Sequence, residues 1–187
     1  MPKINELQLA KELIRFPTVK TEDKGIMKFL SKKLTAIGFK CTIIKSKGTG
    51  TNPALNLYAR YGKSKPHIMY LGHTDVVANL DNWKLPPFKA VVSKGYLNGR
   101  GAQDMKGGIA CWISAVSNFV KDVKFKGSIS IIISADEETT GYGCPAVMKY
   151  LRKKGEKIDF SVVGEPSSNK SVGDEIRIGR RGSMNGI

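Results

Sequence analysis

Short apolar runs alternate with amphipathic helical segments along this chain, and this alternation is what most constrains its fold. Apolar residues recur at helical spacing from Ile4 to Ile14, from Ile26 to Ile37 and from Ile109 to Val120, and a fourth helix is expected from Pro145 to Lys154. The runs with the length and composition of strands are residues 41–44, 55–61, 68–71, 129–133 and 160–163. This order predicts an α/β fold, a three-layer domain with a mixed, largely parallel central sheet.

For some of these strands the sequence also predicts exposure or pairing. Residues 55–61 alternate between apolar and polar side chains, which predicts a half-exposed strand that pairs with residues 68–71. The mainly apolar runs at residues 129–133 and 160–163 predict buried strands. A separate hairpin is expected to turn at Lys94-Gly95.

The charge of the chain is strongly basic, with 31 Lys and Arg against 16 Asp and Glu and a formal net charge of +15. The basic residues are scattered over element ends and loops, without an aromatic-interleaved RNA motif, a zinc finger or a basic helix. We interpret them as a lysine-rich solvated surface and expect no nucleic-acid partner. The first residues lack the apolar core of a signal peptide and no apolar run reaches membrane-spanning length, so we expect a cytoplasmic protein without membrane attachment.

Potential ligands follow the ends of three predicted strands. The strand at 68–71 runs into His73 and Asp75, that at 129–133 into Asp136-Glu137-Glu138, and that at 160–163 into Glu165. If the three strands are parallel, these groups lie along one edge of the sheet, where open α/β sheets bind ligands. Asp104 stands just before the clearest helix, where a helix cap and a metal ligand are equally good interpretations.

A cation is the simplest way to neutralise several acids at one edge, because unpaired buried charge is costly. The three cysteines are far apart, so His, Asp and Glu would hold the metal, a set that suits zinc and also cobalt or manganese. Asp75 can fix the tautomer of His73. In extended chain Glu137 and Glu138 point to opposite sides, so one can bind metal while the other acts as general base. His67, at the far end of the strand, is interpreted as structural.

Four segments resemble, in order and spacing, the signatures of the dinuclear zinc aminoacylase and carboxypeptidase family of M20 type. They are Gly72-His73-Thr74-Asp75-Val76-Val77, Gly99 to Gly107, Asp136-Glu137-Glu138 and Gly164-Glu165-Pro166. Further likeness around Trp83 and from Gly173 to Ser183 extends the resemblance over nearly the whole chain. Ala78, Gln103 and Ser167 depart from the usual pattern, and none of these departures removes a ligand.

The resemblance implies a centre with two zinc ions, for which cobalt can substitute. His73 and Glu165 would bind one ion and Asp104 would bridge the pair. Glu138 would bind the second ion, and Glu137 would be the general acid/base. These roles come from the family resemblance and not from the spacing of the residues.

The resemblance also implies an activity, hydrolysis of the amide bond of N-succinyl-LL-2,6-diaminopimelate in lysine and diaminopimelate biosynthesis. Asp75 would orient His73, and Arg180 would hold a carboxylate of this small-molecule substrate. Within the family, the alternatives are acetylornithine deacetylase, aminoacylase and carboxypeptidase activity. From another class, the alternative is a non-catalytic basic binding fragment.

Family members are longer than this sequence. Residues 1–179 are expected to form the incomplete N-terminal part of the catalytic domain, and residues 180–187 to begin the connection to a lid and dimerisation domain absent from this chain. In the family, a further metal-binding histidine follows that domain. We therefore expect the full-length protein to be a homodimer through the lid, and this chain by itself to be nearly inactive.

Overall fold

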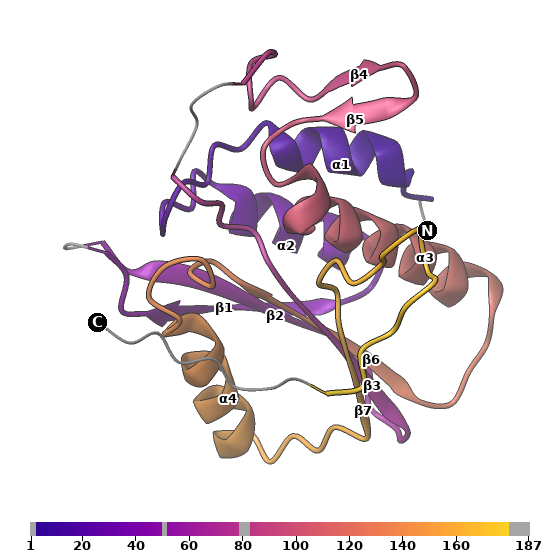
Figure 1. Ribbon diagram of the computed structural model, residues 1–187. Coiled ribbons are helices and arrows are strands. Elements are labelled where there is room, and N and C mark those ends of the chain that lie inside the picture. The colour runs from indigo at the N-terminus through magenta and orange to yellow at the C-terminus, as the bar shows by residue number, and fades with distance from the viewer. Residues whose placement is uncertain (1–2, 50–51, 79–82, 180–187) are drawn as a thin grey trace.

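The computed structural model describes residues 3–49, 52–78 and 83–179 (Figure 1). Five strands form one sheet in the order β1-β2-β6-β3-β7. Their bounds are Lys40–Ser46 for β1, Ala54–Gly62 for β2, His67–His73 for β3, Ser128–Ser134 for β6 and Phe160–Val163 for β7. Strand β3 is parallel to both β6 and β7, whereas β2 is antiparallel to β1 and β6. The expected mixed sheet is confirmed.

Helices cover both faces of this sheet and give the three layers that the sequence predicts. Helices α1, α2 and α3 lie on one face and α4 lies on the other (Figure 1). They span Glu6–Ile14, Ile26–Ala36, Gly107–Asp122 and Gly143–Lys153. No helix in the described ranges combines the length and apolarity needed to cross a membrane.

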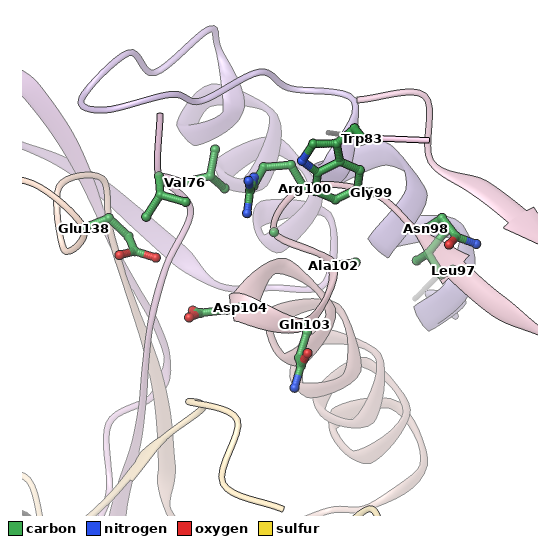
Figure 2. Close-up of a pocket in the computed structure, with 12 residues that line it drawn as sticks. Val76, Trp83, Leu97, Asn98, Gly99, Arg100, Ala102, Gln103, Asp104 and Glu138 are labelled. Atoms are coloured by element: carbon green, nitrogen blue, oxygen red, sulfur yellow. The ribbon is translucent and has the colours of Figure 1, made fainter. Parts of the chain in front are cut away.

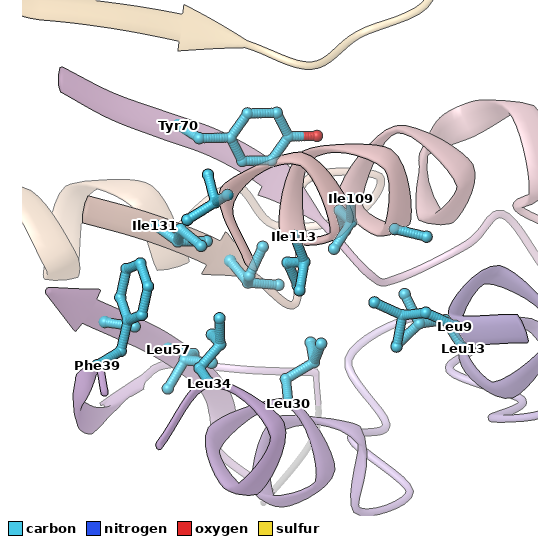
Figure 3. Packing of buried hydrophobic residues seen from close by; sticks show 14 of the residues in the cluster. Leu9, Leu13, Leu30, Leu34, Phe39, Leu57, Tyr70, Ile109, Ile113 and Ile131 are labelled. Atoms are coloured by element: carbon cyan, nitrogen blue, oxygen red, sulfur yellow. The ribbon is translucent and has the colours of Figure 1, made fainter. Parts of the chain in front are cut away.

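The larger core lies between the sheet and the three-helix layer. Leu30 and Leu34 of α2 meet Leu57 of β2, while Ile113 of α3 packs with Ile131 of β6 in the same cluster (Figure 3). All five side chains are completely buried. Burial of a side chain of this size contributes about 1.5–3 kcal/mol, so this layer holds the sheet and the helices in fixed positions.

The predicted pairing of β2 with β3 is wrong, because β6 lies between them. All seven residues of β6 are buried, and a strand buried on both faces is most stable in the centre of a sheet. The prediction of a half-exposed β2 is also wrong. Asn56 and Tyr58, two of the three polar side chains in its alternating pattern, are buried at 0% and 5% exposure. Asn56 is satisfied there by donating to the main-chain oxygen of Ile44 and accepting from the amide of Ala135.

Strand β7 differs from the prediction as well. It was expected to be buried, but Phe160, Val162 and Val163 are 63%, 40% and 52% exposed. The strand is the last in the sheet order and pairs with β3 alone. An apolar run therefore identified the strand correctly but not its position at the edge.

The separate hairpin is confirmed. Strands β4 (Val91–Ser93) and β5 (Tyr96–Asn98) are antiparallel and joined through Lys94 and Gly95. Both turn residues have positive φ, 52° and 81°, as a two-residue hairpin turn requires.

Candidate metal centre

The carboxyl ends of the three parallel strands meet at one edge of the sheet, as expected from their sequence. His73 is the last residue of β3 and pairs with Ser134, the last residue of β6. Glu165 follows β7 by two residues, and the amide of Gly164 between them donates to Leu71 of β3. The sheet register therefore places the histidine and the acidic segments side by side.

His73 is the centre of this edge and is only 2% exposed. Its Nε2 atom lies 2.9 Å from Oδ1 of Asp104 and 3.7 Å from Oε1 of Glu165. Its Nδ1 atom lies 3.1 Å from the main-chain oxygen of Asp75 and 3.4 Å from the carboxylate of the same residue. Asp75 is thus beside one ring nitrogen, as predicted, and the other nitrogen faces two acids.

Burial alone would lower the pKa of His73, but the carboxylates of Asp75, Glu165 and Asp104 outweigh it and raise this pKa to about 9. A proton on the buried ring is thus stabilised by three negative groups. A metal cation at Nε2 would meet the same negative groups, so the electrostatics of the pocket suit a positive ligand.

Asp75 also makes hydrogen bonds that its sequence spacing from His73 did not indicate. Its carboxylate accepts hydrogen bonds from the amides of Glu137 and Glu138, at 3.1 and 2.8 Å. These two glutamates lie in a turn and not in extended chain, so the reason given for their divergence was wrong. Glu137 is exposed and Glu138 is half-buried. Asp75 therefore ties the acidic turn to the histidine.

Asp104 reaches the site from an irregular turn, Ala102–Lys106 (η1), that precedes α3. Lys106 anchors this turn: its amide donates to Gly101, and its Nζ donates to the main-chain oxygen of Phe16 at 2.8 Å. The Lys106 side chain is completely buried. Burial lowers its pKa to about 7, against the opposing attraction of Asp75. Sequence reasoning missed Lys106, because a lysine is usually exposed and only its neighbour Asp104 pointed to the site.

Two overlapping groups of side chains could each hold a metal ion. One is His73, Asp104 and Glu138, and the other is His73, Glu137 and Glu165, with the donor atoms of each group within 4.8 Å of one another. Burial, and after it the charge of Asp104, raises the pKa of Glu138. One imidazole with several carboxylates is a donor set that suits zinc, cobalt or manganese. The described residues therefore fit the metal that the sequence predicted.

The other residues considered in the sequence do not belong to this cluster. Asp136 is fully buried, and its carboxylate accepts from the amides of Tyr142 and Gly143 at the start of α4, so it is structural. His67 is at the opposite end of β3, as expected, where it contacts Lys157 and Ser130. Arg180 lies outside the described residues.

Two cavities are lined by residues of the candidate site. Asp104 and Glu138 border a cavity of about 520 Å³ that also contains Trp83 and Arg100. In Figure 2 the two carboxylates approach each other from opposite sides, and the guanidinium of Arg100 lies over the indole of Trp83, 5.0 Å from the ring centre.

The second cavity, of about 670 Å³, is bordered by His73, Glu137 and Glu165. Arg177 and the exposed strand β7 complete its wall.

A fold and a cluster of this kind are consistent with a metal-dependent hydrolase, and comparison with known proteins places the chain in such a family. The model of Peptidase family M20/M25/M40 matches residues 69–179. This match covers more than half of the chain, which therefore belongs to that family. The family resemblance of the sequence motifs is confirmed, and membership implies a metal cofactor.

Similar proteins with curated names are succinyl-diaminopimelate desuccinylases. The protein of Pelagibacter ubique (strain HTCC1062) is 51% identical over 189 residues, which cover 99% of this chain and 49% of that protein. The protein of Ehrlichia canis (strain Jake) is 44% identical over 97% of this chain and 48% of its own length. The chain thus spans about half the length of the curated relatives it matches.

Solved structures support the fold. Human carnosine dipeptidase 1 matches with a TM-score of 0.71 and 22% identity, over 84% of this chain and 37% of that one. The M20 family metallo-carboxypeptidase Sso-CP2 from Sulfolobus solfataricus matches with a TM-score of 0.69 and 20% identity, over 86% of this chain and 37% of that one. The predicted α/β class is confirmed by both.

Proposed function

We propose that the full-length protein hydrolyses the amide bond of N-succinyl-LL-2,6-diaminopimelate to succinate and LL-2,6-diaminopimelate. The observation that carries this choice of substrate is the 51% identity, over 99% of the chain, to a succinyl-diaminopimelate desuccinylase. The convergence of three acidic segments on His73 supports amide hydrolysis in general, since such a site is shared by hydrolases with other substrates.

The proposed metal centre contains two zinc ions, with cobalt as a substitute. His73 and Glu165 would hold one ion, Asp104 would bridge, and Glu138 would hold the second ion. The closeness of Nε2 of His73 to the carboxylates of Asp104 and Glu165 supports the first site. Bound ions would polarise the scissile carbonyl and make the attacking water more acidic.

Glu137 is proposed as the general acid/base. Its carboxylate would take a proton from the attacking water and deliver it to the amine nitrogen as the carbon–nitrogen bond breaks. Its exposure on the wall of the larger cavity gives it access to water and substrate, and supports this role. Asp75 would position Glu137 through the amide hydrogen bond and would orient the His73 ring.

The remaining proposals concern the full-length protein. Arg180 would bind a carboxylate of the substrate, and a lid domain would join two subunits in a cytoplasmic homodimer. In this division, residues 1–179 belong to the catalytic domain and residues 180–187 begin the connection to the lid.

An assay of the full-length protein tests the substrate. Succinate release from N-succinyl-LL-2,6-diaminopimelate should exceed acetate release from N-acetylornithine and amino-acid release from acyl amino acids or dipeptides. Faster turnover of one of the latter substrates would assign the protein to another activity of the family. Metal-free binding to nucleic acid that weakens steeply with salt would favour the basic binding fragment instead.

A further inference from the structure

A tyrosine beneath the candidate metal centre carries a hydroxyl that the fold itself does not use. Tyr70 of β3 is 2% exposed, and its ring is stacked on Trp112 of α3 at a centroid distance of 4.9 Å and an angle of 17°. Within the described part of the chain, its Oη atom has no hydrogen-bond partner. Figure 3 shows the ring between β3 and α3. A buried hydroxyl without a hydrogen-bond partner is unfavourable, so the stability of the fold does not explain why this hydroxyl is present.

The hydroxyl lies directly against the segment that carries Glu165. A Cβ atom added to Gly164 would overlap Oη of Tyr70 and would come within 2.7 Å of Cε of Met105. A Cβ atom added to Gly108, at the start of α3, would lie 3.4 Å from the same Oη. The two glycines thus leave room for the tyrosine at the junction of β3, β7 and α3.

The hydroxyl is also a donor in the neighbourhood of a carboxylate. Burial raises the pKa of Tyr70, and the negative charge of Glu165 raises it further. A phenol hydroxyl is a hydrogen-bond donor, so it can donate to an acid next to it. Glu165 follows Gly164 directly, and its side chain is 26% exposed.

We infer that Tyr70 is a positioning residue that donates a hydrogen bond from Oη to the Glu165 carboxylate and holds this carboxylate toward His73. Tyr70 would touch neither the substrate nor the metal and would act through Glu165. Hydrogen bonds of this kind orient metal-binding carboxylates in other sites. The inference rests on the proposed metal centre, in which Glu165 is a ligand.

The test measures cobalt binding to the purified full-length protein by titration, together with the visible absorption of the bound cobalt. Tyr70→Phe keeps the ring and its stacking on Trp112 but removes the hydroxyl. We expect its cobalt affinity to fall about tenfold, the low end for loss of such a hydrogen bond, with an altered cobalt spectrum. Thermal unfolding of the metal-free variant checks that the fold is retained.

Tyr58→Phe is the matched control. Tyr58 is 5% exposed and packs in the cluster with Val147 and Leu151 of α4, on the other face of the same sheet. Loss of its hydroxyl should leave cobalt affinity and spectrum unchanged. A purely structural effect of removing a buried hydroxyl would instead change both variants in the same way.

Glu165→Gln completes the experiment, alone and combined with Tyr70→Phe. If the hydroxyl acts through Glu165, adding Tyr70→Phe to Glu165→Gln should weaken cobalt binding no further. Wild-type affinity in Tyr70→Phe, or full additivity in the double variant, would overturn the inference while the metal centre stands. Absence of cobalt binding by the wild-type protein would overturn the proposed centre itself.

Discussion

The two histidines of the chain stand at opposite ends of strand β3, and their surroundings differ in charge. His67 and His73 are both buried, at 1% and 2% exposure. The ring nitrogens of His67 each contact a neutral oxygen at 2.8 Å, the carbonyl of Lys157 and the hydroxyl of Ser130. The ring nitrogens of His73 face carboxylates.

This difference shows why His73, and not His67, is the candidate cation ligand. Burial lowers the pKa of His67, whereas the acids around His73 overcome burial and raise its pKa to about 9. Residue type and burial are thus the same at both ends of the strand. The carboxyl ends of β3, β6 and β7 supply acids, so the direction of the strands decides which histidine is the candidate metal ligand.

The largest effect on activity is expected at the His73 end of β3, which we call the charged end, from Glu137→Gln in the full-length protein. If Glu137 moves the proton, kcat should fall at least about 100-fold, the low end for general acid–base catalysis. Metal content by elemental analysis should stay at the wild-type value. Because Glu137 also lies within ligand distance of His73 and Glu165, loss of metal in this variant would show that it is a ligand and not the base.

A smaller effect, on cobalt affinity, is expected from a change in pH. The carboxylates around His73 raise its pKa to about 9, so a metal that binds at a lower pH must displace a proton from the ring. Because this pKa is raised above the unfolded value, the proton stabilises the metal-free fold fully below about pH 6.5 and ceases to do so as the pH rises through about 9.

Cobalt affinity should therefore rise about tenfold per pH unit between about pH 7 and 9 and level off above, as expected for displacement of one proton. Competition titrations with a chelator of known proton affinity measure this slope. A slope of zero over this range would mean that His73 is already neutral and that the contrast in charge between the two histidines is false.

The smallest effect on the metal centre is expected from a substitution of His67, at the opposite end of β3. His67→Leu leaves the carbonyl of Lys157 and the hydroxyl of Ser130 without their partner, so the free energy of unfolding should fall by about 1–3 kcal/mol. Cobalt affinity should not change. Chemical denaturation of the metal-free protein measures the first quantity, and a shift in cobalt affinity would show that the two ends of β3 are coupled.

The sequence identified the groups of the candidate site better than it identified the sheet. Apolar runs ending in His73 and Glu165 predicted where those side chains would meet, because parallel strands bring their ends together. The order of the strands was not predictable in this way. A strand pairs with partners distant in the chain, and local alternation could not reveal that β6 separates β2 from β3.

Residues that support the site were also hidden from the sequence. Lys106 lies in the Gly99 to Gly107 segment and Tyr70 in an apolar run, but neither context marks them as buried supports. Their roles depend on contacts with Phe16 and Gly164, which are far from them in the chain. Asp75 was predicted beside His73, but its hydrogen bonds to the acidic turn required the fold. Sequence patterns thus identified the candidate site residues, whereas the residues that support them became visible only in the packing of the fold.

The central claim is that the charged end of β3 holds the metal, and the most direct measurement is cobalt titration of His73→Ala and His67→Ala side by side. Loss of a ligand should abolish tight binding in His73→Ala, while His67→Ala should bind with wild-type affinity. Asp104→Ala and Glu165→Ala, which remove carboxylates at 2.9 and 3.7 Å from Nε2 of His73, should also weaken binding. Unchanged affinity in His73→Ala, Asp104→Ala and Glu165→Ala would contradict the account.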